Sequence, residues 1–305
     1  MGWCCEWCGA ITRSNFTYNC TGHTTNFVKA SVLHSKENKN SCSPLAAVRF
    51  VILVVSDLHL GKRPELDRSS LTDLRACIDH YPSSLMRVVF LGDTFDAFIE
   101  YPGKVPAPVQ EWSVLVRDLK SQNIEVTYFA GNHDRWHLGF ISNLLGRPVA
   151  RKPEVTLVGG RTIWMEHGDE ADKHSRLVQL GRAVSNNAIV YKLLTWLLPF
   201  GGGQVLASWV SRHFAGFEPN LKTVSALHAY AHALLGEKKC DVVIMGHCHQ
   251  AGMEITDFGT YLNTGDWYQG RSFAMIDPEN GFRISLLKWT PDGPEIQSEE
   301  VFSSI

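Results

Sequence analysis

Eight side chains of the kinds that bind metal ions recur just after five short segments of the sequence. They are two aspartates, five histidines and one asparagine: Asp57, His59, Asp93, Asn132, His133, His167, His247 and His249. Imidazole and carboxylate groups suit manganese, iron or zinc rather than calcium. Because eight such groups exceed what one ion needs, we expect two divalent ions about 3.5–4 Å apart, the arrangement used for in-line displacement at phosphorus.

Taken singly, these residues have ordinary structural explanations. An aspartate after a strand usually caps a helix or a turn, and an isolated histidine is usually a surface residue or a satisfied core residue. The recurrence of the same placement after five segments favours a shared site instead. Glycines adjoin several of the groups and would let the backbone turn tightly beside the ions: Gly92, Gly131, Gly168 and Gly246.

The segments that precede these groups have the pattern of β-strands. Four have the pattern of buried strands and one that of a hairpin: Arg49–Val55, Arg87–Leu91, Ile124–Ala130, Asp241–Met245 and the hairpin Thr156–Glu166. Helical spacing of apolar residues marks Leu71–Tyr81 and Val109–Leu119, and Gly252–Trp289 alternates as antiparallel strands do. Ligands of open α/β sheets bind beyond the carboxyl ends of the strands, so the five loops are expected to meet at one site.

The overall composition is that of a folded protein with one or two domains. Apolar residues make up 44% of the 305 residues and charged residues 20%, which excludes a disordered chain, a collagen and a coiled coil. The net charge of -2 gives no basic footprint, so we expect no nucleic-acid partner. The sequence has no apolar run of the length that a spanning helix needs.

Residues 1–47 are polar, and we expect them to form a disordered tail. This tail holds most of the cysteines, so the remaining chain is cysteine-poor, as is usual in a reducing compartment, and no signal-peptide pattern is present. Three alternatives stay open for the tail. One is a zinc site formed by Cys5, Cys8, Cys20 and His23. The others are acylation at Gly2, Cys4 and Cys5, although Glu6 departs from the myristoylation pattern, and a later translation start.

The sequence resembles the calcineurin-like metallophosphoesterases over about residues 50–290. The resemblance rests on five motifs, in order: Asp57-Leu-His59, Gly92-Asp93-x-x-Asp96, Gly131-Asn132-His133-Asp134, His167-Gly168-Asp169 and Gly246-His247-x-His249. The family likeness implies an α/β fold, an αββα sandwich of two mixed sheets flanked by helices.

The resemblance also implies a role for each group. One ion would be held by Asp57, His59 and His249, and the other by Asn132, His167 and His247. Asp93 would bridge the two ions, His133 would stabilise or protonate the leaving oxygen, and Asp134 would orient His133. The ions would be manganese, with iron or zinc as alternatives. The chain would then be a metal-dependent hydrolase that needs no covalent enzyme intermediate.

One branch of the family is especially similar: the UDP-2,3-diacylglucosamine diphosphatases of lipid A biosynthesis. The likeness lies in Ser56–Gly61, His167–Asp169 and Tyr261–Trp267. It implies hydrolysis of UDP-2,3-diacylglucosamine to UMP and 2,3-diacylglucosamine 1-phosphate. His133 stands where the best-known members of this branch carry arginine, whereas a second set within the branch has histidine as here.

Residues 170–238 separate the fourth and fifth motifs, and we expect them to form a helical lid insertion. The apolar stretches Ala188–Phe200 and Val205–Val210, with several basic residues, would suit a phosphorylated amphiphile or an anionic membrane surface. The alternative is a pair of core helices with a solvated basic face. The candidate substrate-binding residues are Asn132, His133, Arg212 and Lys222. His228 and His232 have a metal-binding spacing, but without a third ligand nearby we expect them on the lid surface.

We therefore expect a catalytic domain over residues 48–290 and a C-terminal tail over residues 291–305. The enzyme would be cytoplasmic, peripherally associated with the inner membrane, and would act on a lipid-linked nucleotide. Two other functions stay open. One is another calcineurin-like phosphodiesterase or phosphatase that acts on nucleotides or phosphoproteins, and the other is a non-catalytic scaffold. The sequence predicts no oligomeric state.

Overall fold

The computed structural model describes residues 50–81, 84–171, 188–199, 202–203, 205, 221–279 and 281–302. The chain divides into two compact units, Met1–Ala46 and Ala47–Ile305, and every described residue belongs to the second. The predicted tail, with its zinc and acylation alternatives, lies outside the described residues, and so does Arg212.

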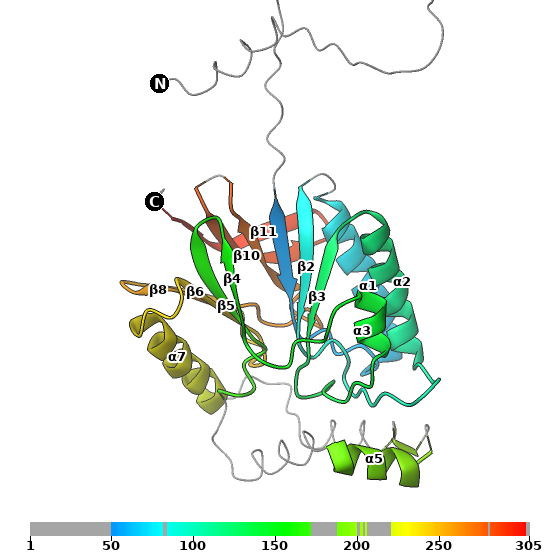
Figure 1. Cartoon of the computed structure of the whole chain (residues 1–305). Helices are drawn as coiled ribbons and strands as arrows, with labels where there is room; N and C mark the ends of the chain where they lie inside the picture. Colours follow the sequence, from blue (N-terminus) through cyan, green and yellow to red (C-terminus); the bar gives the residue numbers. More distant parts are fainter. Residues whose placement is uncertain are drawn as a thin grey trace, which may run out of the picture. The chain divides into compact units, whose positions relative to one another are not determined.

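Six strands form the first sheet, in the order β11-β10-β9-β1-β2-β3 (Figure 1). Their bounds are β1 Val51–Val55, β2 Leu85–Leu91, β3 Glu125–Phe129, β9 Ser272–Asp277, β10 Arg283–Thr290 and β11 Gly293–Val301. β1, β2 and β3 run parallel, whereas β9, β10 and β11 pair antiparallel. The carboxyl ends of the three parallel strands therefore meet at one edge of this sheet.

Five strands form the second sheet, in the order β4-β5-β6-β8-β7. Their bounds are β4 Glu154–Val158, β5 Arg161–Met165, β6 Val242–Met245, β7 Gly252–Thr256 and β8 Gly259–Asn263. β4 and β5 form the predicted hairpin, and β5, β6 and β8 run parallel. This sheet too is mixed, because β7 pairs antiparallel with β8.

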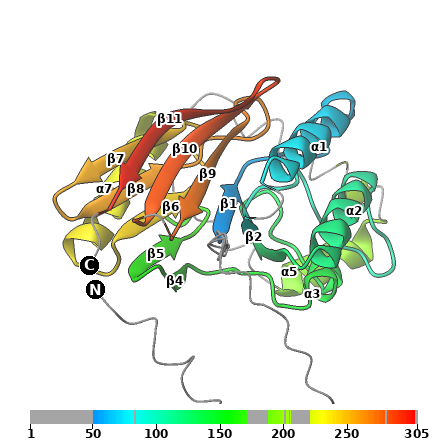
Figure 2. The same ribbon diagram turned by 90° about the horizontal axis from the view of Figure 1, so that it is seen from above.

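Helices cover the outer face of each sheet (Figure 2). α1 Pro64–Asp79, α2 Ala107–Ser121 and α3 Phe140–Leu145 lie beside the first sheet, and α7 Leu221–Gly236 lies beside the second. The strand side chains alternate accordingly. Leu53 and Val55 face the helices in one core with Trp112, whereas Ile52 and Val54 pack between the sheets. Burial of both faces explains the continuous apolar runs, and the predicted αββα sandwich is confirmed.

The predicted C-terminal tail over residues 291–305 is wrong for residues 293–301. These residues form β11, which pairs antiparallel with β10 along its whole length. β11 is polar and is an edge strand, with Ile296 and Val301 more than half exposed. Its sequence therefore lacks the apolar run that marked the central strands, and only the pairing with β10 reveals it.

The predicted lid insertion over residues 170–238 is also too long. Its final part is α7, whose side chains Leu227 and Ala231 are fully buried against Val243 of β6 and Tyr261 of β8. α7 is thus a helix of the sandwich and not of a lid. Of the remainder, the structure describes mainly α5 Ala188–Leu197, which confirms a helix there. Among the described helices, none is long and apolar enough to cross a membrane.

Candidate metal centre

The candidate ligands come from the carboxyl ends of strands in both sheets. Asp57 and His59 follow β1, Asp93 follows β2, and Asn132 follows β3, all at one edge of the first sheet. His167 follows β5, and His247 and His249 follow β6, in the second sheet. The sandwich places the two edges together, so all seven candidate ligands lie in one region, as the strand-end rule predicts.

The first group of donors consists of Asp57, His59 and His249. His249 Nε2 lies 3.3 Å from Asp57 Oδ1 and 3.1 Å from His59 Nε2. Asp57 Oδ1 is fully buried and has no hydrogen-bond partner of good geometry among the described residues. A buried carboxylate oxygen that faces two imidazole nitrogens fits a cation, because all three atoms can then donate electron pairs to it.

The second group of donors consists of Asn132, His167 and His247, with Asp93. His167 Nε2 lies 3.3 Å from Asn132 Oδ1 and 3.3 Å from Asp93 Oδ2. Asp93, His167 and His247 together offer three donor atoms within 4.8 Å of one another. Asp93 also forms such a cluster with His59 of the first group and with His133, so its position between the two groups suits a bridging carboxylate.

Hydrogen bonds from the ring Nδ1 atoms orient two of the imidazoles. His167 Nδ1 lies 2.9 Å from the carbonyl oxygen of Leu91, and His133 Nδ1 lies 2.7 Å from that of Asp96. A carbonyl oxygen can only accept, so Nδ1 must carry the proton in each ring. Nε2 of each ring is then left facing the other candidate residues, as metal ligation by His167 requires.

The backbone at these residues is unusual. Five of the seven candidate ligands have positive φ: Asp57 53°, His59 46°, Asp93 49°, His247 70° and His249 55°. This left-handed conformation costs a non-glycine residue of order 1–3 kcal/mol and tends to occur at functional sites. Such a concentration of strain in residues from three loops supports a functional role for the cluster.

Two glycines are required by close packing around the ligands. A Cβ atom on Gly131 would lie 2.1 Å from Asp93 Oδ1, and one on Gly246 would lie 2.6 Å from Asp57 Oδ2. Both distances are far shorter than a van der Waals contact. The motif glycines therefore leave room for the carboxylates in addition to allowing the turns that the sequence predicts.

The buried carboxylates and imidazoles of the site shift one another's pKa values. Burial alone would raise the pKa of Asp57, but the imidazoles of His249 and His167 lower it to about 2. Burial would lower the pKa of His167, but the carboxylate of Asp93 raises it to about 10. Divalent ions would replace the protons that balance these carboxylates, so metal binding should release protons.

Asp134 has a different environment from the predicted one. Its carboxylate accepts hydrogen bonds from the amide N–H of Thr94 at 2.8 Å and of Gly131 at 2.8 Å, and from the hydroxyl of Tyr128 at 2.5 Å. The ring of His133 is held instead by the Asp96 carbonyl. The prediction that Asp134 orients His133 is therefore wrong. Asp134 ties together the loops after β2 and β3, and with them the backbone that carries Asp93 and Asn132.

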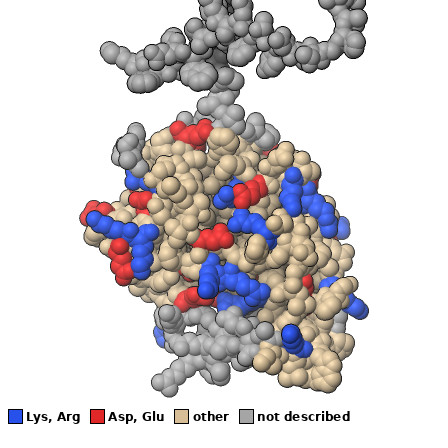
Figure 3. Space-filling model, viewed as in Figure 1, with Lys and Arg blue, Asp and Glu red and all other residues tan. Residues whose placement is uncertain are grey.

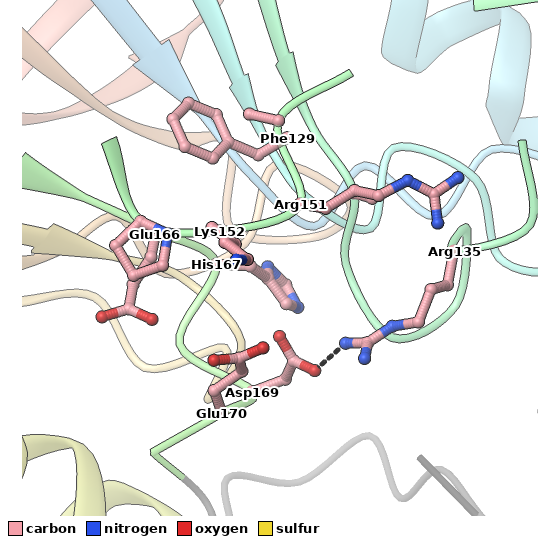
Figure 4. Close-up of a pocket in the computed structure, with 11 residues that line it drawn as sticks. Phe129, Arg135, Arg151, Lys152, Glu166, His167, Asp169 and Glu170 are labelled. Carbon is pink, nitrogen blue, oxygen red and sulfur yellow. Dashed lines mark hydrogen bonds and ion pairs between the residues drawn. The ribbon is translucent and has the colours of Figure 1, made fainter. Parts of the chain in front are cut away.

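A cavity of about 300 Å³ opens beside His167 (Figure 4). Arg135, Arg151 and Lys152 lie on its wall together with Glu166 and Asp169, and Arg135 forms an ion pair with Asp169. Sequence reasoning missed these basic residues. Arg151-Lys152 precedes the β4–β5 hairpin and is the one local signal that could have drawn attention to them.

The two basic residues predicted to bind substrate are not confirmed. Arg212 lies outside the described residues. Lys222 is exposed near the start of α7 and is not among the residues that line the cavity beside His167. Asn132 and His133, the other two predicted substrate-binding residues, do lie among the candidate ligands.

Comparison with known proteins identifies the family. Residues 50–251 match the calcineurin-like phosphoesterase family, and this match covers every candidate ligand. The chain belongs to the calcineurin-like phosphoesterases. As a member of this family it is a metal-dependent phosphoesterase, and the candidate clusters agree with the divalent metals that the family uses.

One relative of this calcineurin-like phosphoesterase matches along most of its own length. The chain is 27% identical over 256 residues to the UDP-2,3-diacylglucosamine hydrolase of Porphyromonas gingivalis, covering 75% of this chain and 95% of the relative. Solved structures with a similar fold include the Escherichia coli phosphoesterase Yfce and Vps29 of Entamoeba histolytica. Each is 14% identical, with a TM-score of 0.43, and covers 83% of this chain and 100% of the other.

Proposed function

We propose that the protein hydrolyses the pyrophosphate bond of UDP-2,3-diacylglucosamine and releases UMP and 2,3-diacylglucosamine 1-phosphate. The observation that carries this proposal is the likeness to the Porphyromonas gingivalis hydrolase, because it extends over 95% of that protein. The substrate combines a nucleotide, a pyrophosphate and two acyl chains.

The pyrophosphate would bind at the two groups of candidate ligands. Asp57, His59, Asp93 and His249 would hold one divalent ion, and Asp93, Asn132, His167 and His247 the other. When bound, the two ions supply an activated water and neutralise charge on the phosphate oxygens. We propose manganese for both positions, since oxygen and imidazole ligands permit it.

His133 would act on the leaving oxygen. Its Nδ1 proton is held by the Asp96 carbonyl, and its Nε2 lies 3.9 Å from Asp93 Oδ2 at the side of the site. With Nδ1 held by the carbonyl, Nε2 is the ring atom that faces a group bound over Asp93, and it would donate to the leaving oxygen when the ring carries a second proton there. The ring is about 10% exposed, so a substrate can reach it.

The nucleotide end of the substrate would lie beside basic side chains next to the metal centre. Arg151 and Lys152 line the cavity next to His167, where they could contact phosphate oxygens or the uridine. Over the whole face seen in Figure 3, acidic and basic side chains are intermingled. No broad basic surface is visible among the coloured residues of that face.

The acyl chains would contact α5. Tyr191 fixes this helix by packing against Ile99 and Tyr101, in the loop after β2, and its hydroxyl donates to the Glu100 carbonyl oxygen. The other side of α5 is apolar and exposed: Ile189 is 75% exposed, Trp196 81% and Leu197 59%. An exposed apolar helix face near a phosphoesterase centre suits a lipid substrate. We also propose that the protein contacts the cytoplasmic side of the inner membrane peripherally, through the same face of α5.

Phosphorus NMR of the Mn²⁺-loaded protein tests the substrate. We expect UDP-2,3-diacylglucosamine to give two new monoester signals, from UMP and the sugar 1-phosphate, with slow cleavage of a soluble chromogenic diester in a parallel sample. Fast cleavage of the diester with no turnover of the lipid nucleotide would overturn the substrate assignment. That result would favour a calcineurin-like phosphodiesterase that acts on another substrate.

A further inference from the structure

Three metal-binding side chains that do not belong to the centre described above meet on the outer side of the second sheet. His228 and His232 lie one turn apart on α7, and Glu254 lies on β7. Glu254 Oε2 is 3.0 Å from His228 Nδ1 and 3.1 Å from His232 Nε2. The third group whose absence from the sequence argued against a metal site is thus supplied by the fold.

Regular secondary structure holds these three groups in place. α7 is fixed by the buried side chains Leu227 and Ala231, on the face next to the histidines. Glu254 stands opposite Tyr261 in the antiparallel β7–β8 pair, and the His228 ring contacts the Tyr261 ring edge-on, with centroids 5.0 Å apart. Donors on packed helices and strands need little reorganisation to bind an ion.

The separation of the carboxylate from each imidazole fits a tetrahedral ion. Metal–ligand bonds of 2.0–2.1 Å in a tetrahedral site separate neighbouring ligand atoms by about 3.3 Å. The two histidine–carboxylate distances are within a few tenths of an ångström of that value, and all three donor atoms lie within 4.8 Å of one another. Two imidazoles and one carboxylate are a known ligand set for zinc.

Space for further ligands adjoins the three groups. A cavity of about 160 Å³ is lined by His228 and Glu254 and, on its other wall, by Cys248 and Asn263. Since each histidine side chain is about 45% exposed, water or a small ligand can complete the coordination. Three protein ligands with an open position distinguish an exchangeable site from a closed structural one.

We propose that His228, His232 and Glu254 form a third metal site, which binds a zinc-class transition ion and joins α7 to β7. The site uses none of the residues of the phosphoesterase centre. The proposal of this site therefore does not depend on the proposed substrate, and each can be tested separately.

The test measures zinc binding to the full-length, untagged protein. Equilibrium dialysis against Zn²⁺, followed by metal analysis, should show one ion fewer per chain for His232→Ala and Glu254→Gln than for the wild type. Loss of even a supporting group typically weakens a site 10- to 100-fold, so loss of a ligand should weaken this one by about 100-fold or more. Using the difference between variants removes the contribution of any zinc bound elsewhere, including the N-terminal cysteines.

Two further variants complete the design. Glu237→Gln, which removes an acid paired with Lys239 just beyond α7, should bind as much zinc as the wild type. Asp93→Ala should lose ions from the phosphoesterase centre and still bind the ion at α7. In that background zinc should raise the melting temperature, and the added Glu254→Gln change should abolish the rise. Equal zinc content in the wild type, His232→Ala and Glu254→Gln would overturn the proposal.

Discussion

Asp93 is the residue on which both halves of the candidate centre depend. Its Oδ2 atom faces His167 at 3.3 Å, its Oδ1 atom accepts a hydrogen bond from the His133 amide at 2.9 Å, and it clusters with His59. Asp93→Ala should remove bound metal and lower turnover by more than about 10³-fold together, because the two ions lose their shared ligand. Metal analysis and a diester assay check this, with Asp257→Ala in the exposed β7–β8 turn as the control. Retention of both ions by Asp93→Ala would contradict the bridging role.

Replacement of His133 should lower turnover without removing the metal ions. Because its Nδ1 proton is held by the Asp96 carbonyl and its Nε2 points to the site from the side, His133→Ala should keep both ions. Turnover should fall about 10²- to 10⁴-fold, the usual contribution of a proton donor. Metal analysis and kcat on the same preparation measure the two effects. Unchanged turnover would remove His133 from the mechanism.

Asp134 should behave differently from His133. Its carboxylate satisfies backbone N–H groups of two loops, so Asp134→Ala leaves several buried donors unpaired. We expect a loss of about 3 kcal/mol or more in the free energy of unfolding, together with weaker metal binding. Denaturant unfolding of the metal-free protein measures the first effect. A variant as stable as the wild type that merely turns over slowly, as His133→Ala should, would restore the predicted orienting role.

The sequence predicts the ligands better than it predicts their partners. The seven candidate ligands are recognisable because each has a metal-binding side chain and follows a strand, two properties that are local. The group that holds the His133 ring is the backbone carbonyl of Asp96. Arg135 and Arg151 are brought to the cavity beside His167 only when the chain folds. Such contacts depend on tertiary structure, so the sequence does not place these groups at the site, although the basic pair Arg151-Lys152 is visible in it.

At the scale of secondary-structure elements, the loops after the strands must leave space for the carboxylates. Gly131→Ala replaces no ligand, but its Cβ atom would lie 2.1 Å from Oδ1 of the candidate ligand Asp93. Metal affinity should therefore fall about 10- to 100-fold, as when a supporting group is lost. Gly252→Ala is the matched control, because its Cβ atom would have no neighbour within 4 Å. Calorimetric titration with Mn²⁺ compares the two, and equal affinities would contradict the packing argument.

The buried central strands could be predicted from the sequence, whereas the edge strand β11 could not. β1 and β6 are apolar throughout, and β2 and β3 are mostly apolar, because both of their faces are covered, and the predicted ranges match these strands within about two residues. The sequence does not predict β11 as a strand, because an exposed edge strand needs no apolar run. The predicted lid wrongly includes α7, because the sequence shows an apolar helix but not the sheet on which this helix packs.

In the molecule as a whole, the sandwich would carry the hydrolytic centre and α5 would contact the acyl chains. Trp196 and Ile189 are largely exposed on α5, whereas most of the candidate ligands are buried in the loops at the strand ends. Replacing both with serine should raise KM for the lipid nucleotide about tenfold or more, since each apolar side chain contributes about 1.5–3 kcal/mol when it is buried against lipid. Turnover of a soluble diester should not change. Parallel loss of both activities would show that α5 supports the centre rather than the acyl chains.

On this proposal, loops from both sheets hold two ions in one site. Anomalous X-ray scattering at the manganese edge, from crystals of the Mn²⁺-loaded protein, tests it most directly. We predict two peaks about 3.5–4 Å apart. One should lie against Asp57, His59 and His249, the other against Asn132, His167 and His247, with Asp93 between them. A single peak, or peaks away from these residues, would contradict the account.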